Sequence, residues 1–243
     1  MDNQKKHSFV IRPSECDLNK RLSPQAAAER MEELAYLHAE ALGLGFMDLM
    51  NVGAFWALTR LTVTFEKLPK LGEEITLQTW PKNMVGLFAV RDWLWFDAQG
   101  EIIGRASSSW VLMDIKSRKP RPLESLSGLD FERYPESALE EMPGKIHRAE
   151  EGREIRKFNI PLSDLDLNGH VNNAKYFRWL LNAFTQETWK SNWNKIEANY
   201  LGEAFPKEEV LLLGSSEGNE QIIDAVSTQR KKTVFRAKIS FTG

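Results

Sequence analysis

Polar side chains are densest in residues 164–173, DLDLNGHVNN, and their spacing resembles the first half of a calcium-binding loop. Four residues match the first, third, fifth and sixth positions of an EF-hand: Asp164, Asp166, Asn168 and Gly169. The twelfth position should supply a bidentate Glu, but it is Lys175, and a cation cannot ligate Ca²⁺. The preceding residues alternate like a strand and contain Pro161, so no helix enters the loop. We therefore expect no metal and no cofactor here.

Asp, Asn and His also recur at alternate positions in this stretch. If the backbone is extended, Asp166, Asn168 and His170 project to one side, and Leu165 and Leu167 project to the other. An isolated His is usually an ordinary loop residue, and Asp and Asn also favour turns. Three polar side chains on one side of a strand would instead be able to act together, so this stretch is a candidate reactive site.

Composition narrows the class of protein that could carry such a site. The chain has 243 residues, of which 42% are hydrophobic and 27% charged, with a net charge of −2. It is long enough for one large domain or two smaller ones, and it has no basic excess that would predict nucleic-acid binding. Cys16 is the one cysteine, which excludes an internal disulfide and fits a reducing compartment. We find no apolar run of about 20 residues and no signal-like leader, so we expect a cytoplasmic protein without a membrane span.

The reactive stretch has a second, altered copy near the N-terminus. Residues 14–22, SECDLNKRL, align without gaps on residues 163–171, SDLDLNGHV. Asp17 matches Asp166 and Asn19 matches Asn168, but Arg21 stands where the second copy has His170. Because Arg stays protonated near neutral pH, it cannot act as a base. The chain therefore looks duplicated, with the chemistry kept in the second half.

Each copy is followed by a predicted helix. In the first, Ser23 is the expected N-cap, Pro24 the first helical residue and Gly43 the stop, and one face carries Ala27, Met31, Leu34, Ala35 and His38. In the second, Asn172 or Asn173 caps residues 174–189. One face of that helix carries Phe177, Leu180, Leu181, Phe184 and Thr188, and other sides carry Tyr176, Trp179 and Ala183. Helices this apolar belong in a core.

Segments with two-residue alternation follow each helix and predict antiparallel strands. They are residues 56–67, 73–80, 87–97 and 101–114 in the first half, and 194–201, 208–216, 221–228 and 232–242 in the second. Pro-rich, charged residues from about 116 to 152 read as a connector. We expect an α+β fold in which each half wraps a sheet around a central helix, with domains at 1–130 and 153–243 and a linker at 131–152.

The motif DLDLNGHVNNAKYFRWLL and the first-half segments RLTVTFEKLPKLGEEITLQTW and RDWLWFDAQGEIIGRASSSWVLMD resemble the acyl-acyl carrier protein thioesterases of plant plastids and bacteria. The resemblance covers nearly the whole chain. It implies a tandem double hotdog fold and hydrolysis of fatty acyl thioesters on an acyl carrier protein, and it allows a homodimer. No transit peptide precedes the motif region, so a bacterial relative is expected.

The resemblance also implies roles for individual residues. Asp166, Asn168 and His170 match the family's D-x-N-x-H motif, and Glu203 matches a carboxylate that follows on a later strand. Many plant members have a cysteine beside that carboxylate, but here the residue is Ala204. We therefore expect Glu203 to act as general base on water, oriented by His170 or Asn168, and backbone N–H groups of residues 171–173 to receive the oxyanion. The open alternatives are a turn role for Asp166 and a solvated strand-end position for Glu203.

The first half is expected to shape the acyl pocket, with Met31, Leu34, Trp56 and Phe88 as lining residues that would also serve as ordinary core. Arg118 and Lys119 lie in a basic run that is either a solvated turn or a docking patch for an acidic carrier protein.

Two other functions remain open from the sequence. A 3-hydroxyacyl-thioester dehydratase would also use His and a carboxylate, and it would yield an enoyl thioester in place of free thiol. A non-catalytic acyl-binding hotdog protein would bind acyl chains without turnover.

Overall fold

The computed structural model describes residues 3–126, 134–148 and 152–242, and in this part of the chain the strands form one antiparallel 10-stranded sheet. First-half strands are β1 (Lys5–Val10), β2 (Ala54–Phe65), β3 (Glu74–Val85), β4 (Phe88–Phe96) and β5 (Ile102–Asp114). Second-half strands are β6 (Arg153–Asn159), β7 (Trp193–Tyr200), β8 (Glu209–Glu217), β9 (Glu220–Ser227) and β10 (Lys232–Phe241). The order across the sheet is β1-β3-β4-β5-β2-β7-β10-β9-β8-β6.

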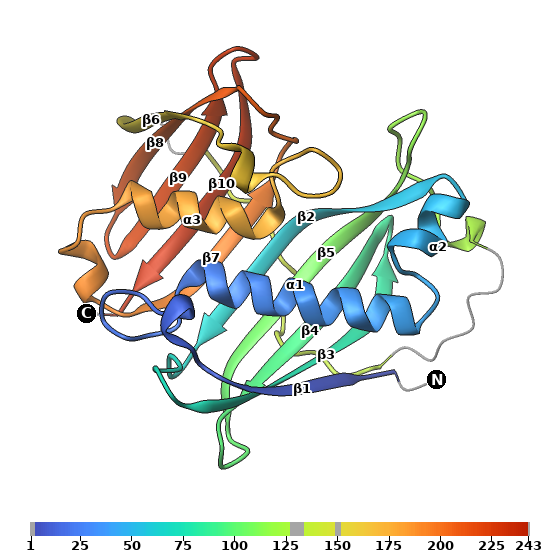
Figure 1. Ribbon diagram of the computed structural model, residues 1–243, viewed down its shortest axis with the longest axis horizontal. Coiled ribbons are helices and arrows are strands. Elements are labelled where there is room, and N and C mark those ends of the chain that lie inside the picture. The colour runs from blue at the N-terminus through green and yellow to red at the C-terminus, as the bar shows by residue number, and fades with distance from the viewer. Residues whose placement is uncertain (1–2, 127–133, 149–151, 243) are drawn as a thin grey trace.

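The two halves meet through hydrogen-bonded strands. β2 pairs with β7 from Arg60↔Asn199 to Thr64↔Lys195, so two five-stranded halves become one continuous sheet (Figure 1). Pairing in this way leaves neither half with an open edge at the junction.

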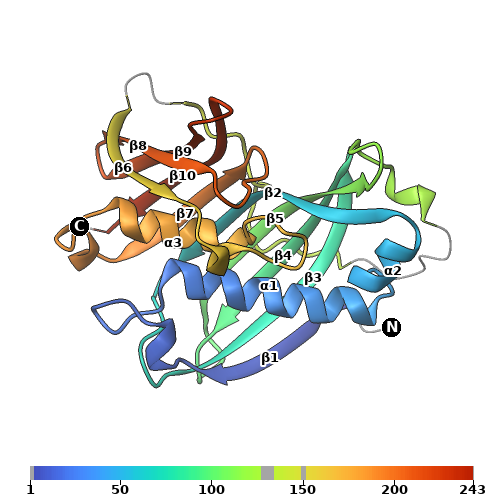
Figure 2. The same ribbon diagram turned by 45° about the horizontal axis from the view of Figure 1, so that its top comes forward.

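Two long helices lie against the same side of the sheet and run in opposite directions (Figures 1 and 2). They are α1 (Pro24–Ala41) and α3 (Asn173–Ala183), and shorter elements are α2 (Phe46–Asn51) and the 3-10 turns η1 (Pro13–Glu15), η2 (Leu123–Ser125), η3 (Leu162–Asp164) and η4 (Thr188–Lys190). α1 begins as predicted, because the Ser23 Oγ accepts a hydrogen bond of 3.2 Å from the Ala26 N–H and Pro24 follows it. Gly43, at φ +70°, lies just beyond the C-terminus of the helix.

The second helix is shorter than the sequence predicted. α3 ends at Ala183, and Phe184 is already extended, so Thr188 does not share the helix face. The rings of Phe184 and Trp189 both pack against Phe241 at the end of β10, at centroid distances of 5.8 and 5.6 Å. Burial of this aromatic cluster competes with continuation of the helix and prevails.

The core confirms the predicted fold class. Buried residues of α1 and α3 pack with those of the strands in one cluster, which includes Met31, Phe177, Trp193 and Phe235. Each half is thus a central helix wrapped by antiparallel strands, the tandem double hotdog arrangement. The predicted boundary at residue 130 lies outside the described residues, and the division into domains stays a prediction. Within the described residues, we find no helix that is long and apolar enough to cross a membrane.

Candidate active site

The reactive motif forms a tight turn, which corrects the expectation of an extended stretch. The Asp166 N–H donates to the His170 carbonyl at 2.8 Å, and the Gly169 N–H donates to the Asp166 carbonyl at 3.1 Å. Gly169 has φ +76°, a left-handed conformation that glycine adopts without steric cost. The backbone therefore reverses between Asp166 and His170, and the three polar side chains are not aligned along one side of a strand.

Asp166 organises this turn. Its Oδ1 accepts from the N–H groups of Asn168 at 2.8 Å and His170 at 3.4 Å, and its Oδ2 accepts from the Asn168 Nδ2 at 3.4 Å. A carboxylate that satisfies backbone donors two and four residues ahead fixes the loop conformation. The contacts support a positioning role for Asp166, in agreement with the turn alternative.

The structure brings His170 and Glu203 together although they are far apart in sequence. The His170 Nδ1 lies 3.4 Å from the Glu203 Oε1, and the imidazole packs edge-on against Phe205 at 5.1 Å between ring centroids. The Val171 N–H donates to the Ala204 carbonyl at 3.0 Å, which ties the motif loop to the segment after β7. These contacts create a His–carboxylate pair that is partly open to solvent.

Glu203 also has a cationic partner from the first half. The Arg118 Nη2 donates to both carboxylate oxygens of Glu203, and the guanidinium lies over the Phe55 ring at 4.9 Å. Arg118 has φ +55° in the turn after β5, and its side chain is about half exposed. Lys119 beside it is exposed. Of the two residues predicted to face a carrier protein, Arg118 thus reaches the candidate site itself.

Two of the three predicted oxyanion donors are already engaged. The Val171 N–H is bound to Ala204, and the Asn172 N–H donates to the Asp164 carbonyl at 2.9 Å. Asn172 is the N-cap of α3, with its Oδ1 accepting from the Ala174 N–H at 3.0 Å. The N–H of Asn173, the first residue of α3, makes no hydrogen bond within the described part of the chain. It remains the candidate oxyanion donor at this helix start.

A narrow cavity of about 20 Å³ adjoins the start of α3. Its wall is mostly apolar and comes from both helices and the central strands: Ala28, Met31, Glu32, Leu58, Leu61, Trp93, Ser108, Trp110, Asn173, Ala174 and Tyr200. Met31 is the predicted lining residue that lies on it. Leu34 is buried in the main core, Trp56 packs beside α2, and Phe88 lies under the Arg60 guanidinium. For these three, a pocket role stays a prediction.

Sequence reasoning missed Glu32, a carboxylate on this cavity wall. Its Oε2 accepts from the Asn172 Nδ2 at 3.1 Å, and its Oε1 accepts from the Asn173 Nδ2 at 3.3 Å. Burial raises the pKa of Glu32, and hydrogen bonds from the two asparagines offset part of this rise. Glu32 lies outside the predicted apolar face of its helix, so no local pattern indicated this role.

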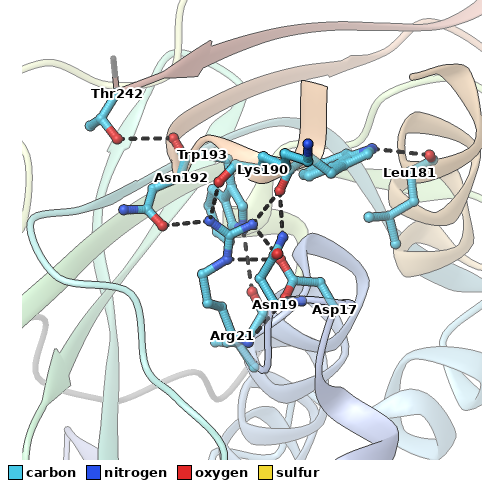
Figure 3. Close-up of polar contacts among 10 residues, drawn as sticks. Asp17, Asn19, Arg21, Leu181, Lys190, Asn192, Trp193 and Thr242 are labelled. Atoms are coloured by element: carbon cyan, nitrogen blue, oxygen red, sulfur yellow. Dashed lines mark hydrogen bonds and ion pairs between the residues drawn. The ribbon is translucent and has the colours of Figure 1, made fainter. Parts of the chain in front are cut away.

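The altered copy of the motif is used differently (Figure 3). The buried Arg21 guanidinium pairs with Asp17 at 2.8 Å and donates to the Trp189 carbonyl and the Asn192 Oδ1, both at 2.5 Å. Asn19 also donates to the Trp189 carbonyl, at 2.6 Å. These bonds attach the first motif loop to the connection between α3 and β7.

Two other residues raised by the sequence have structural roles. Asp164, the first position of the calcium pattern, is buried, accepts from the Trp179 Nε1 at 3.0 Å and pairs with Arg178. Cys16 is partly buried, and burial together with Asp17 and Glu15 raises the pKa of its thiol. A thiol held in its protonated form is a poor nucleophile.

Both halves of the chain match known proteins. Models of the acyl-ACP thioesterase N-terminal and C-terminal domains match residues 2–125 and 147–242. A chloroplastic oleoyl-acyl carrier protein thioesterase of Arabidopsis thaliana is 29% identical over 75% of this chain and 54% of its own length. A chloroplastic FATB2 acyl-acyl-carrier-protein hydrolase of Cuphea viscosissima is 31% identical over 75% of this chain and 47% of its own length. The chain thus spans about half the length of the curated relatives it matches.

Solved structures extend the likeness to the whole chain. The crystal structure of an acyl-ACP thioesterase from Bacteroides thetaiotaomicron superposes with a TM-score of 0.91 at 26% identity, over 99% of this chain and 98% of that one. A 12:0-ACP thioesterase from Umbellularia californica shares the fold, with a TM-score of 0.85 at 21% identity over 100% of this chain and 98% of that one. Since both domain models match in their expected order, the chain belongs to the acyl-ACP thioesterase family.

Proposed function

We propose that this protein hydrolyses fatty acyl-acyl carrier protein thioesters to free fatty acid and carrier thiol. The observation that carries the proposal is the His170–Glu203 pair, 3.4 Å apart, on the motif loop that leads into α3, whose first residues line an apolar cavity. Membership of the thioesterase family supports the reaction and the carrier-linked substrate.

In the proposed mechanism, Glu203 accepts a proton from a water molecule as that water attacks the thioester carbonyl carbon. His170 holds the carboxylate and the water in line, and the Asn173 N–H donates to the developing oxyanion. The tetrahedral intermediate then collapses with cleavage of the C–S bond. The proton taken from water passes to the departing thiolate, which leaves as the thiol.

Arg118 competes with a water molecule for Glu203. It donates to both carboxylate oxygens, so its release would leave more of the carboxylate free to hold the attacking water. An acidic carrier protein docking near Arg118 and Lys119 would compete for the guanidinium. Substrate docking and exposure of the base are thus linked in the proposal.

The pathway does not use a cysteine. Ala204 replaces the cysteine found in many plant members, and Cys16 lies in the altered first loop with a raised thiol pKa. A reducing, cytoplasmic setting fits this single cysteine, and a homodimer stays a prediction.

A thiol-release assay on carrier-linked acyl substrates tests the function. Free thiol and free acid in equal amounts support it. An enoyl thioester with the thiol still blocked would indicate the dehydratase, and acyl binding without turnover would indicate a binding protein.

A further inference from the structure

Glu32 is a carboxylate of the first half placed at the reactive end of the second half. It lies on α1 and forms part of the cavity wall next to Met31, and both of its oxygens accept hydrogen bonds from Asn172 and Asn173 at the start of α3. These are the residues that directly follow the His170–Val171 segment of the motif. A side chain from one half therefore fixes the orientation of amides in the other.

The surroundings of Glu32 are unusual for a structural carboxylate. Within the described part of the chain it forms no ion pair with Lys, Arg or His. The nearby Glu29, one turn earlier on α1, and Asp166 on the motif loop are both negatively charged. The nearby cation Lys175 of α3 pairs with Glu29 at 2.7 Å. The Tyr200 ring lies on the same cavity wall as Glu32. A partly buried carboxylate without a cation is costly to keep, so its position calls for a functional explanation.

The hydrogen bonds define what Glu32 can do. The Asn172 side chain has its Oδ1 on the Ala174 N–H, which directs its Nδ2 toward Glu32. Asn173 is held through its Nδ2 by Glu32 and through its carbonyl by the Tyr200 hydroxyl at 3.2 Å. Together these bonds hold the residues on both sides of the Asn172–Asn173 peptide, whose N–H makes no hydrogen bond within the described part of the chain and is the candidate oxyanion donor.

We propose that Glu32 is a positioning residue of the hydrolytic site, holding the Asn172 and Asn173 amides so that the start of α3 is aligned on the thioester carbonyl. This inference rests on the proposed function. It makes the site a composite of both halves, with the first half supplying an aligning carboxylate as well as apolar surface.

The test compares Glu32→Gln with Glu33→Gln, a control one residue away whose side chain is 61% exposed. Gln keeps the size of Glu but offers an amide N–H₂ to two amide donors. We expect kcat on acyl-carrier substrate to fall on the order of 10- to 100-fold with KM changed little, because the misalignment affects the reacting geometry more than binding. Glu32→Asp, which retains the charge, should recover part of the loss.

The pH profile and the stability separate positioning from a merely structural role. The folded-state pKa of Glu32 is raised above its ordinary value of 4.5, so its contribution to stability is present below 4.5 and is lost as the pH rises through the folded value. At neutral pH the Gln variant should therefore unfold at the same temperature or higher, and the acid limb of kcat/KM should move to lower pH. A loss of activity that only follows a lower unfolding temperature, or full activity, would overturn the proposal.

A second measurement does not depend on turnover. The side-chain amide NMR signals of Asn172 and Asn173 should shift with pH as Glu32 titrates in the wild-type protein and should lose that response in Glu32→Gln. If the wild type releases no thiol but these signals respond, the proposed function fails while the alignment stands. If they respond equally in both proteins, the alignment itself is wrong.

Discussion

The two motif loops share their backbone conformation but differ in what their side chains contact. The Asp17 N–H donates to the Arg21 carbonyl at 2.7 Å, as the Asp166 N–H donates to the His170 carbonyl at 2.8 Å. Lys20, at φ +60°, takes the left-handed position that Gly169 takes at +76°. Local structure is therefore conserved between the copies, and the difference lies in the residue that ends the turn.

That residue has different partners in the two copies. Arg21 binds carbonyls of the α3–β7 connection and becomes buried, whereas His170 faces Glu203 and stays partly exposed. The comparison teaches that one turn can anchor the two halves or contribute to the proposed site, depending on whether its last side chain is buried among hydrogen-bond acceptors or partly exposed beside a carboxylate.

Loss of the Arg21 anchor should have the largest effect, and this effect is on the stability of the fold. In Arg21→Ala, Asp17 remains buried without its cation, and the Trp189 and Lys190 carbonyls each lose a donor. The free energy of unfolding should therefore fall by about 3–5 kcal/mol. Urea unfolding measures this, with the exposed neighbour variant Lys20→Ala as control. The kcat of the folded fraction should stay nearly unchanged. A stability loss no greater than that of the control would remove the anchor role.

Loss of the reactive pair should come next. His170→Ala and Glu203→Gln should each lower kcat on the order of 10²-fold, because the proposed general base or its proposed orienting partner is removed. The matched control is Glu66→Gln, since Glu66 precedes Pro69 in the first half as Glu203 precedes Pro206 in the second. Thiol release under saturating substrate is the measurement. Normal turnover by either folded variant would exclude that residue from the mechanism.

Charge reversal at Lys119 should have a smaller effect, which is limited to the KM for acyl-carrier substrate and to low salt. Arg118 cannot test docking alone because it binds Glu203, but Lys119 is exposed and does not contact that carboxylate. In Lys119→Glu, KM for acyl-carrier substrate should rise several-fold at low salt and depend less on salt, while a small soluble thioester is spared. Lys67→Glu, a reversal at another exposed lysine, should show neither change. Equal effects on both substrates would argue against docking at this turn.

Replacement of the thiol should have the smallest effect. Cys16 donates to the Arg12 carbonyl at 3.3 Å and belongs to the loop that lacks the histidine. Cys16→Ser should keep its kcat within about twofold, since no step of the proposed mechanism uses a thiolate. The raised pKa of Cys16 also predicts slow alkylation at neutral pH and faster alkylation as the pH rises. A folded Ser variant that releases no thiol from its substrate would refute water activation by Glu203.

Much of the architecture could be predicted from local patterns. The N-cap at Ser23, the alternating strands and the duplicated motif depend on neighbouring residues, and all appear in the structure. The C-terminal end of α3 could not be predicted, because Phe184 and Trp189 leave the helix pattern to reach Phe241 on a distant strand.

The sequence by itself determined where the two long helices begin, the strand pattern, the family and which copy of the motif retains a histidine, because each depends on residue type and short spacing. Only the tertiary structure decided what those side chains contact. Arg118 and Glu203 are 85 residues apart, Glu32 and Asn172 are 140 apart, and Arg21 and Trp189 are 168 apart. Contacts over such separations arise from the pairing of β2 with β7 and the packing of α1 with α3. No local pattern encodes them, since they depend on how two complete halves fit together.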